Sequence, residues 1–282
     1  MALTINTNIA SIDAQRNLSG SQMSLATSMQ RLSSGLRINS AKDDAAGLSI
    51  AERMNAQVRG MNVAIRNSND GISLAQTADG ALAQVSNSLQ RMRELAVQAR
   101  NSTNSSSDKD SLNKEFGQLQ AEITRVLGGT TFNGKAILGA DATQLDFQVG
   151  ANTTANDTVS IKTTNMNTDT TMTTVTNTST AVIDSSATSG AIGTVIDNID
   201  KAIDDVNDTR ATFGATESRF DSIISNLQSS VENQTAARSR IMDADFASET
   251  ANMSRSQVLQ QAGTAMIAQA NQLPQQVLSL LR

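Results

Sequence analysis

The stretch that decides the fold covers residues 192–241, IGTVIDNIDKAIDDVNDTRATFGATESRFDSIISNLQSSVENQTAARSRI. Steps of four and then three residues from Ile192 land mostly on apolar side chains as far as Ile241. Residues at that spacing share one face of a helix. Sustained over about seven heptads, the pattern predicts a long helix of the coiled-coil type. Arg210 and Glu217 interrupt this face, either as polar residues that fix register or as edge residues whose stems cover it.

Three further stretches carry the same helical spacing. They span residues 3–36, Met54 to Ala96, and Leu112 to Val126. Turn-forming residues 101–107 separate the last two, which predicts a helical hairpin. Because a helix cannot bury its own apolar face, these helices must pack on one another. The predicted fold class is mainly α, a long antiparallel helical coiled coil or bundle.

A small β-hairpin region is predicted in the middle of the chain, at about residues 143–163. Apolar and polar residues alternate over 145–149, and again around Val159 and Ile161. Residues 167–189 follow, rich in Thr and poor in charge, and are predicted to form a linker. β-branched Thr can also form short strands, so the sequence leaves open whether this linker is ordered.

Short breaks rich in small polar residues divide each helical end in two. We therefore expect a discontinuous terminal-helix domain of residues 1–42 and 245–282, and a second helical domain of residues 43–166 and 190–244. One pair of terminal helices has too little area to form a stable domain alone. A heterologous, non-closing contact between copies would cover them and would give a helical filament. The alternative is a closed long bundle or a dimeric coiled coil.

The residues expected to carry assembly are apolar and lie on the terminal helices. They are Ile5, Ile9, Ile12, Leu25, Met29, Leu32, Leu36, Leu259, Met266, Leu273, Val277, Leu278 and Leu281. Left in water, the apolar tail at the C-terminus would be an aggregation risk. Contacts between copies would remove that risk.

Composition excludes most chemistry. The chain has no His and no Cys, which removes nucleophilic triads, the common zinc sites and disulfides. We therefore expect no enzyme and no cofactor. The net charge of −5 argues against a nucleic-acid partner. No apolar run is long enough for membrane insertion, and the first residues lack the pattern of a secretory signal, so we expect either a cytoplasmic protein or export without cleavage.

Several long motifs, in fixed order, resemble those of bacterial flagellins. They are RLSSGLRINSAKDDAAG at 31–47, RNSNDGIS at 66–73, LQRMRELAVQ at 89–98, TFNG at 131–134, FQVGAN at 147–152, NMSRSQVLQQAG at 252–263 and QANQLPQQVLSLLR at 269–282. The resemblance covers roughly residues 1–166 and 190–282. Residues 167–189 would then be the remnant of the variable region that larger members carry, which makes this chain a short form.

The resemblance implies a structural subunit that polymerises into the flagellar filament for swimming motility. Such chains are exported unfolded through the flagellar type III export apparatus with a flagellin chaperone, and are added at the tip beneath a cap. Filament cap and hook-associated proteins would be neighbours, and the location would be extracellular. In such proteins the terminal helices line an inner tube inside a rod domain. The alternatives are a junction or hook-associated relative and a secreted coiled-coil adhesin.

The resemblance also implies recognition of the monomer by Toll-like receptor 5. The residues that match the recognised segment are Gln90, Arg91, Arg93, Glu94, Leu95 and Glu115. In this interpretation Arg91 is a charged donor, Leu95 an apolar anchor and Glu115 a pairing carboxylate. The competing interpretation is a solvated helix face with charge pairs three residues apart, used only in filament contacts.

Overall fold

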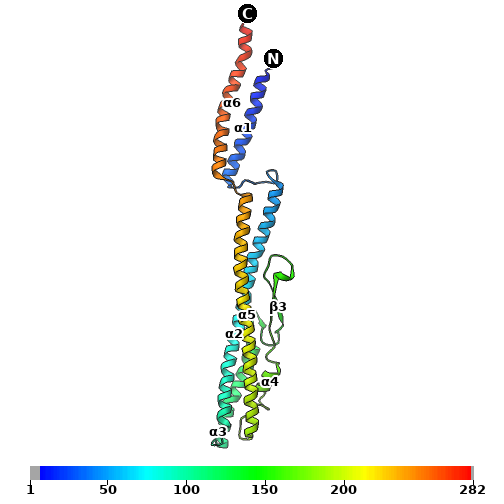
Figure 1. Ribbon diagram of the computed structural model, residues 1–282, viewed down its shortest axis with the longest axis vertical. Helices are drawn as coiled ribbons and strands as arrows, with labels where there is room; N and C mark the ends of the chain where they lie inside the picture. The colour runs from blue at the N-terminus through cyan, green and yellow to red at the C-terminus, as the bar shows by residue number, and fades with distance from the viewer. Residues whose placement is uncertain (1–6, 281–282) are drawn as a thin grey trace. The chain divides into compact units, whose positions relative to one another are not determined.

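The computed structural model describes the backbone of residues 7–280 and the side chains of residues 7–272 (Figure 1). In chain order the elements are α1 (Ile9–Ser34), α2 (Ala45–Ala99), α3 (Ser106–Gly129), β1 (Thr131–Phe132), β2 (Lys135–Ala136), β3 (Gln144–Gln148), a 3-10 turn (Ala155–Asp157), β4 (Thr158–Lys162), α4 (Thr170–Thr176), α5 (Ser189–Met242) and α6 (Phe246–Leu280). Strands β3 and β4 pair antiparallel, with Leu145 opposite Ile161. The predicted mainly helical fold with a central β-hairpin is confirmed.

The chain forms two compact units. Residues 1–56 and 232–282 make up one, and residues 57–231 make up the other. Helices α2 and α5 each contribute residues to both units. The boundaries between the units therefore fall inside long helices, whereas the non-helical breaks lie within the first unit.

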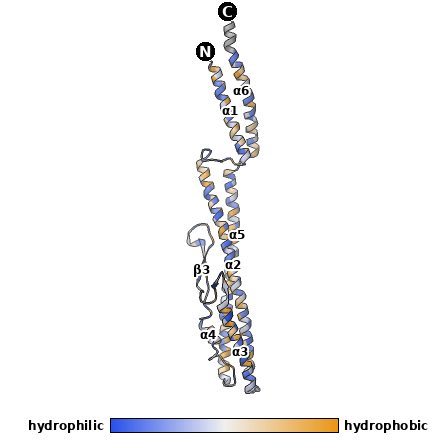
Figure 2. Cartoon of the chain, turned by 180° about the vertical axis from the view of Figure 1, so that it is seen from behind, coloured by the Kyte–Doolittle hydropathy of each residue, from blue (hydrophilic) through white to orange (hydrophobic). Residues whose placement is uncertain are grey.

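Residues 57–231 have a continuous apolar core. Helices α2 and α5 run antiparallel there, and α3 folds back beside α2 (Figure 1). Fully buried Phe116, Phe213 and Phe220 are the largest side chains of this core. Hydrophobic residues gather along the lower part of the helices in Figure 2, beside α3 and α4. This unit therefore has the buried area that an independent domain needs.

The predicted helical repeat accounts for the face that α5 buries. Its apolar positions Ile192, Ile199, Val206, Phe213 and Phe220 are all buried. Seven residues separate each from the next, so they form one stripe along the helix. The stripe is the structural result of the heptad pattern.

Gly71 of α2 leaves the space that the Phe220 ring occupies between α2 and α5. A Cβ on Gly71 would lie 2.7 Å from the Cζ atom of Phe220, so only glycine leaves room for the ring. Phe147 of β3 meets the same ring edge-on, with centroids 5.7 Å apart. Edge-to-face rings attract beyond their burial. Phe220 thus joins α2, α5 and the hairpin.

The charged residues on the α5 stripe lie at its edge. Arg210 is a little over one-third exposed and donates from Nε to Asp79 of α2 at 2.8 Å. Glu217 is half-buried. Burial first, and then the charges of Asp79 and Asp221, raise the pKa of Glu217. Arg210 therefore combines the two predicted roles, since it borders the apolar face and also pairs across it.

The Thr-rich segment that the sequence predicts as a linker is packed into this core. It contains α4, and its buried apolar residues are Met172, Val175, Ala181 and Ile183. Gln120 of α3 is 2% exposed. Its amide nitrogen donates to the carbonyls of Val175 at 2.8 Å and Ala181 at 3.0 Å. The segment is therefore held by side-chain burial and by a buried polar clamp.

Replacing Gln120 with Leu should destabilise residues 57–231. Leu keeps most of the volume but leaves the carbonyls of Val175 and Ala181 without their donor, which costs about 1–3 kcal/mol. The free energy of unfolding, measured with a chemical denaturant, should fall by that amount. Gln118→Leu changes an exposed position of the same helix and is the control. A Gln120→Leu chain as stable as the control would contradict the clamp.

Replacing Glu217 with Gln should stabilise the chain at neutral pH. A carboxyl group whose pKa is raised in the folded state lowers the free energy of unfolding when it is ionised. This loss of stability appears as the pH rises through the unfolded-state pKa and then the folded-state pKa. The gain at pH 7 should be on the order of 0.5 kcal/mol, because Glu217 and Asp221 are like charges four residues apart. The gain should vanish near pH 3, where both states bind the proton. Denaturation midpoints across this range test it, and an equal gain at both ends would contradict it.

Candidate assembly surface on the terminal helices

Helices α1 and α6 run antiparallel and meet along faces with a seven-residue repeat (Figure 1). The repeated positions are Ser11, Leu18, Leu25 and Leu32 on α1, and Glu249, Ser256, Gly263 and Ala270 on α6. A Cβ on Gly263 would lie only 3.2 Å from the Cδ1 atom of Leu18, so the backbones approach closely there. We call these positions the heptad face. Its members on α6 are small, apart from Glu249.

Polar contacts supply much of the binding between the two helices. At one end Ser11 Oγ donates to Asn271 Oδ1 at 2.9 Å, and Asn8 Nδ2 donates to the carbonyl of Ala270 at 2.8 Å. Asn8 also caps α1, because its side chain accepts from the backbone N–H of Ser11. Among the described side chains of α1 and α6, Ala270 is the only apolar one that is buried. The pair therefore has no apolar core of its own within the described region.

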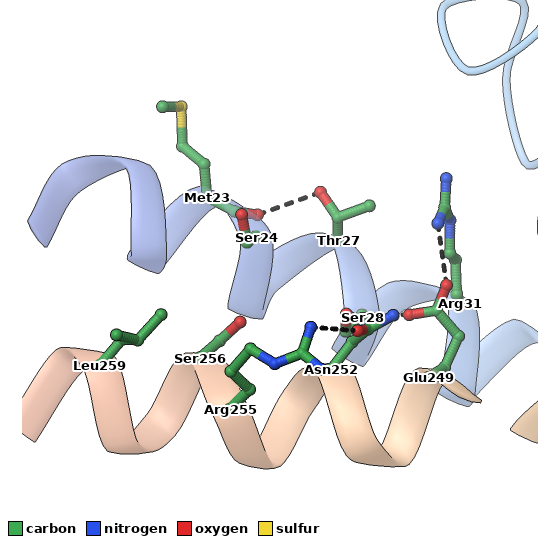
Figure 3. A pocket seen from close by; sticks show the side chains of 10 residues that line it. All are labelled: Met23, Ser24, Thr27, Ser28, Arg31, Glu249, Asn252, Arg255, Ser256 and Leu259. Atoms are coloured by element: carbon green, nitrogen blue, oxygen red, sulfur yellow. Dashed lines mark hydrogen bonds and ion pairs between the residues drawn. The ribbon is translucent and has the colours of Figure 1, made fainter. Parts of the chain in front are cut away.

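At the other end, a buried carboxylate holds the pair (Figure 3). Glu249 is 8% exposed. Its Oε2 accepts from Ser28 Oγ at 2.9 Å and its Oε1 accepts from Arg31 Nη1 at 2.8 Å. The Arg31 hydrogen bond is the main reason that the pKa of Glu249 lies below its usual range, in spite of its burial. The carboxylate is thus ionised and paired at neutral pH.

Several other apolar side chains of the pair are exposed. Ile9 is 60% exposed, Met23 66% and Met29 56% on α1, and Val258 is 64% and Met266 63% exposed on α6. Figure 2 shows mixed hydropathy along both helices. Large apolar side chains are candidates for an interaction surface where several are exposed along one pair of helices. We call this set, with Ile12 and Leu259, the outward apolar face.

The structure places the predicted assembly residues in three groups. Those on the outward apolar face are Ile9, Ile12, Met29, Leu259 and Met266. Those that are half-buried are Leu25, Leu32 and Leu36. Those outside the described residues are Ile5 and Leu281, together with the side chains of Leu273, Val277 and Leu278.

Sequence reasoning missed several members of the site. Met23 and Val258 lie off the apolar repeat that was followed along each helix. Ser28, Arg31 and Glu249 carry the buried cluster, and polar residues give no signal in an apolar pattern. The seven-residue spacing from Glu249 through Ser256 to Ala270 was the available clue.

A groove of about 460 Å³ lies between α1 and α6, with the buried cluster at one end (Figure 3). Met23 and Leu259 supply apolar side chains to it. Its lining is completed by Ser24, Thr27, Ser28, Arg31, Glu249, Asn252, Arg255 and Ser256. The groove therefore offers both apolar and polar contacts, and it shares Met23 and Leu259 with the outward apolar face.

The two non-helical breaks pair with each other. Gly35, with a φ of 70°, ends α1 in the left-handed conformation that glycine adopts most easily. Its carbonyl accepts from the backbone N–H of Ala244 at 2.9 Å, and the backbone N–H of Arg37 donates to Met242 at 2.6 Å. The guanidinium of Arg37 also reaches the carbonyl of Ile241, at 2.7 Å. A small cluster of Ile38, Ala51 and Met242 is buried beside these contacts.

The predicted receptor residues lie on α2 and α3. Gln90, Arg91, Arg93, Glu94 and Glu115 are exposed. Arg91 donates to Glu115 at 2.8 Å and to Glu94 at 2.9 Å. Arg93 pairs with Asp200 of α5. These side chains therefore form an ordered charged surface across neighbouring helices.

Leu95 does not belong to that surface. It is 0% exposed and is packed in the core, so it is not available as the apolar anchor that we assigned to it. The cause is its position on α2, three residues beyond buried Met92, which places both side chains on the side of the helix that faces the core. The exposed apolar side chain near this surface is instead Val97, at 51%.

Residues 7–272 contain no cluster of three acidic side chains that could hold a metal ion. No helix of the described residues is long and apolar enough to cross a membrane.

Comparison with known proteins identifies the family. A family model of the bacterial flagellin N-terminal helical region matches residues 5–143, and a model of the C-terminal helical region matches residues 196–281. Flagellins from Xenorhabdus nematophila and Halalkalibacterium halodurans are 45% and 44% identical, over 100% and 99% of this chain and all of each relative. Flagellin from Bacillus subtilis is 41% identical over 99% of this chain and all of its own.

A solved structure is also similar. The crystal structure of Bacillus cereus flagellin aligns with 61% of this chain and 94% of its own, at 36% identity and a TM-score of 0.49. The two family models together match well over half of the chain. The chain therefore belongs to the bacterial flagellin family, whose members are structural subunits of the flagellar filament and not enzymes.

Proposed function

We propose that the chain joins its filament by burying the outward apolar face of α1 and α6 against other copies. The observation that carries this proposal is the exposure of large apolar side chains on a helix pair that buries mainly small and polar ones. Its internal contact consists of small and polar residues and half-buried Leu side chains, while Met23, Val258 and Met266 are more than three-fifths exposed. Copies related by a non-closing contact could cover all of these side chains at once.

The two compact units suit different roles in this proposal. Residues 57–231 have their own apolar core and can fold in a single copy. Helices α1 and α6 lack such a core in the described region, so they gain most from neighbours. We propose that residues 1–42 and 245–282 form an inner tube and that residues 43–166 and 190–244 form the surrounding rod.

Export in an unfolded state fits the same energetics. A helix pair without an apolar core contributes little to the stability of the free chain, so keeping it unfolded before assembly costs little. We propose passage through the flagellar export apparatus with a flagellin chaperone, followed by addition at the tip. The filament cap and hook-associated proteins would then be partners, and the assembled chain would lie outside the cell.

A junction or hook-associated protein is the second candidate, and a secreted coiled-coil adhesin the third. Each would use the same helices without forming long polymers. Electron microscopy of purified, seeded chain distinguishes them, because only a filament subunit forms long tubes by itself. A chain that stays in short complexes would favour a junction role.

Replacing Leu259 and Met266 together with Ser should weaken polymerisation. Each side chain is more than half exposed in the single chain and would lose about 1 kcal/mol of burial. The concentration of chain left unpolymerised should rise roughly 30-fold, because every 1.4 kcal/mol is a factor of ten. Sedimentation of seeded samples measures it.

The control for this experiment is Val63→Ser with Val97→Ser, which removes two exposed apolar side chains from α2. These changes lie outside the outward apolar face and should leave the residual concentration nearly unchanged. A chain that ends at residue 257 should stay soluble. Tubes formed by that truncated chain would contradict the role given to α6.

We also propose that the free monomer is recognised by Toll-like receptor 5 through the charged surface of α2 and α3. The support is the ordered ion pairing of Arg91 with Glu94 and Glu115, which presents charged side chains in fixed positions. Charged residues held in this way are effective contact points at interfaces. Leu95 is left out of this proposal because it is buried.

Replacing Arg91 and Glu115 together with Ala should lower receptor signalling more than tenfold. Both side chains are about half exposed, so the fold should be retained while two central contacts are lost. Purified monomer on receptor-bearing cells gives the readout. Arg125→Ala with Glu122→Ala removes another exposed ion pair, on α3, and is the control. Equal signalling by the two double variants would refute the proposed contact.

A further inference from the structure

The heptad face of α1 and α6 specifies their relative position weakly. Because the positions repeat every seven residues, sliding α6 by one heptad, about 10.5 Å, brings equivalent positions opposite each other again. Ser256, Gly263 and Ala270 are all small. A Cβ brought opposite Leu18 would need the Leu18 side chain to move by only a few tenths of an ångström, so a slipped register remains accessible. Small residues allow close approach but do not select one register.

Glu249 is the exception on this face. It occupies the same repeat position as Ser256 but carries a charge that is 8% exposed. A buried charge tolerates only a position where it is paired and hydrogen-bonded. Ser28 and Arg31 supply both contacts in the observed register.

Neither neighbouring register can replace those contacts. Sliding α6 one heptad in one direction carries Glu249 past Ser34, where α1 ends, and the guanidinium of Arg37 beyond that end is already bonded to the carbonyl of Ile241. Sliding it in the other direction places Glu249 near Ser21, and residues 17–30 contain no charged side chain. Both movements separate the carboxylate from Arg31.

We infer that Glu249, held by Arg31 and Ser28, is a positioning residue that fixes the register of α6 on α1 and so aligns the outward apolar face for assembly. The alignment matters because Met23 and Leu259 come from different helices and line the same groove. A slip of one heptad would move them apart by about 10 Å. The inference rests on the proposed assembly through these helices.

Two other sets of contacts compete as sources of register. One is the pair of hydrogen bonds from Asn8 and Ser11 to residues 270 and 271 at the far end of the helices, and the other is the backbone contacts of the two breaks. The backbone contacts tie Gly35 to Ala244, immediately beyond the ends of the two helices. A slip would need about one heptad of helix to unwind beside this contact. Phe246, the first residue of α6, is 70% exposed, so little apolar burial keeps that end wound. Glu249 lies in the first turn and is the side chain that anchors it.

Disulfide trapping can read the register, because the chain has no Cys. A Cβ on Gly263 would lie 3.7 Å from the Cβ of Leu18, within the range of about 3.5–4.5 Å that a disulfide needs. The pair L18C/G263C therefore reports the observed register. The pairs L18C/S256C and L18C/A270C report slips of one heptad in either direction.

Each pair is tested in full-length chain that is polymerised with a large excess of the Cys-free chain, so that cross-links form within a chain. With Glu249 present, only L18C/G263C should oxidise. With Glu249→Ser, the ratio of native to slipped cross-links should fall at least tenfold. The charge exchange Arg31→Glu with Glu249→Arg should restore it. Ser256→Ala, tested with the native and the L18C/A270C pairs, is the matched control and should leave the ratio unchanged.

Two results would overturn the inference. An unchanged ratio in the Glu249→Ser chain would show that the register is set without Glu249, by the backbone contacts of the breaks or by the hydrogen bonds of Asn8 and Ser11. Loss of all three cross-links would show that the cluster holds the helices together without selecting their register. Polymer yield is read separately. If the unmodified Cys-free chain forms no polymer, the proposed assembly fails together with this inference, whereas normal polymer with an unchanged ratio refutes the register role alone.

Discussion

The contact between α1 and α6 is the constraint on which the rest depends. The small residues of α6 meet Leu18, Leu25 and Leu32 of α1, which approach closely but stay only half-buried. Hydrophobic burial is the main stabilising term in folding, so this pair begins with little of it. Apart from its half-buried Leu residues, the pair leaves several large apolar side chains exposed, and other molecules can cover them. Low apolar burial within the single copy and an exposed apolar surface are therefore two results of one arrangement.

The unit of residues 57–231 solves the opposite problem. Its helices bury Phe116, Phe213 and Phe220 within one chain, and Gly71 removes a side chain so that Phe220 fits. The hairpin joins the core through Phe147. A chain with six Phe and no other aromatic residue places three of them here as fully buried anchors. This unit can supply a fixed body to which the terminal helices are attached by sequence.

The long helices could be predicted because the spacing of their apolar residues follows directly from the number of residues per helical turn. The heptad stripe of α5 and the alternation in β3 and β4 needed no knowledge of partners. Leu95 was misplaced because a motif matched by resemblance does not say which side of the helix is buried. The packing of residues 167–189 was missed because Met172, Val175 and Ile183 are scattered among Thr. Glu249 escaped notice because its role requires Arg31, more than 200 residues away in the chain.

Charge therefore has different physical meaning in the two units. The pairs Arg91–Glu115, Arg93–Asp200 and Arg210–Asp79 join helices that already share an apolar core, and exposed pairs of this kind add little. Glu249 is buried where no such core exists, so its pairing with Arg31 has no apolar substitute in the described region. Salt screens exposed pairs strongly and buried pairs weakly. The contact between α1 and α6 is thus held by a buried ion pair, the kind of electrostatic contact that a change in ionic strength weakens least.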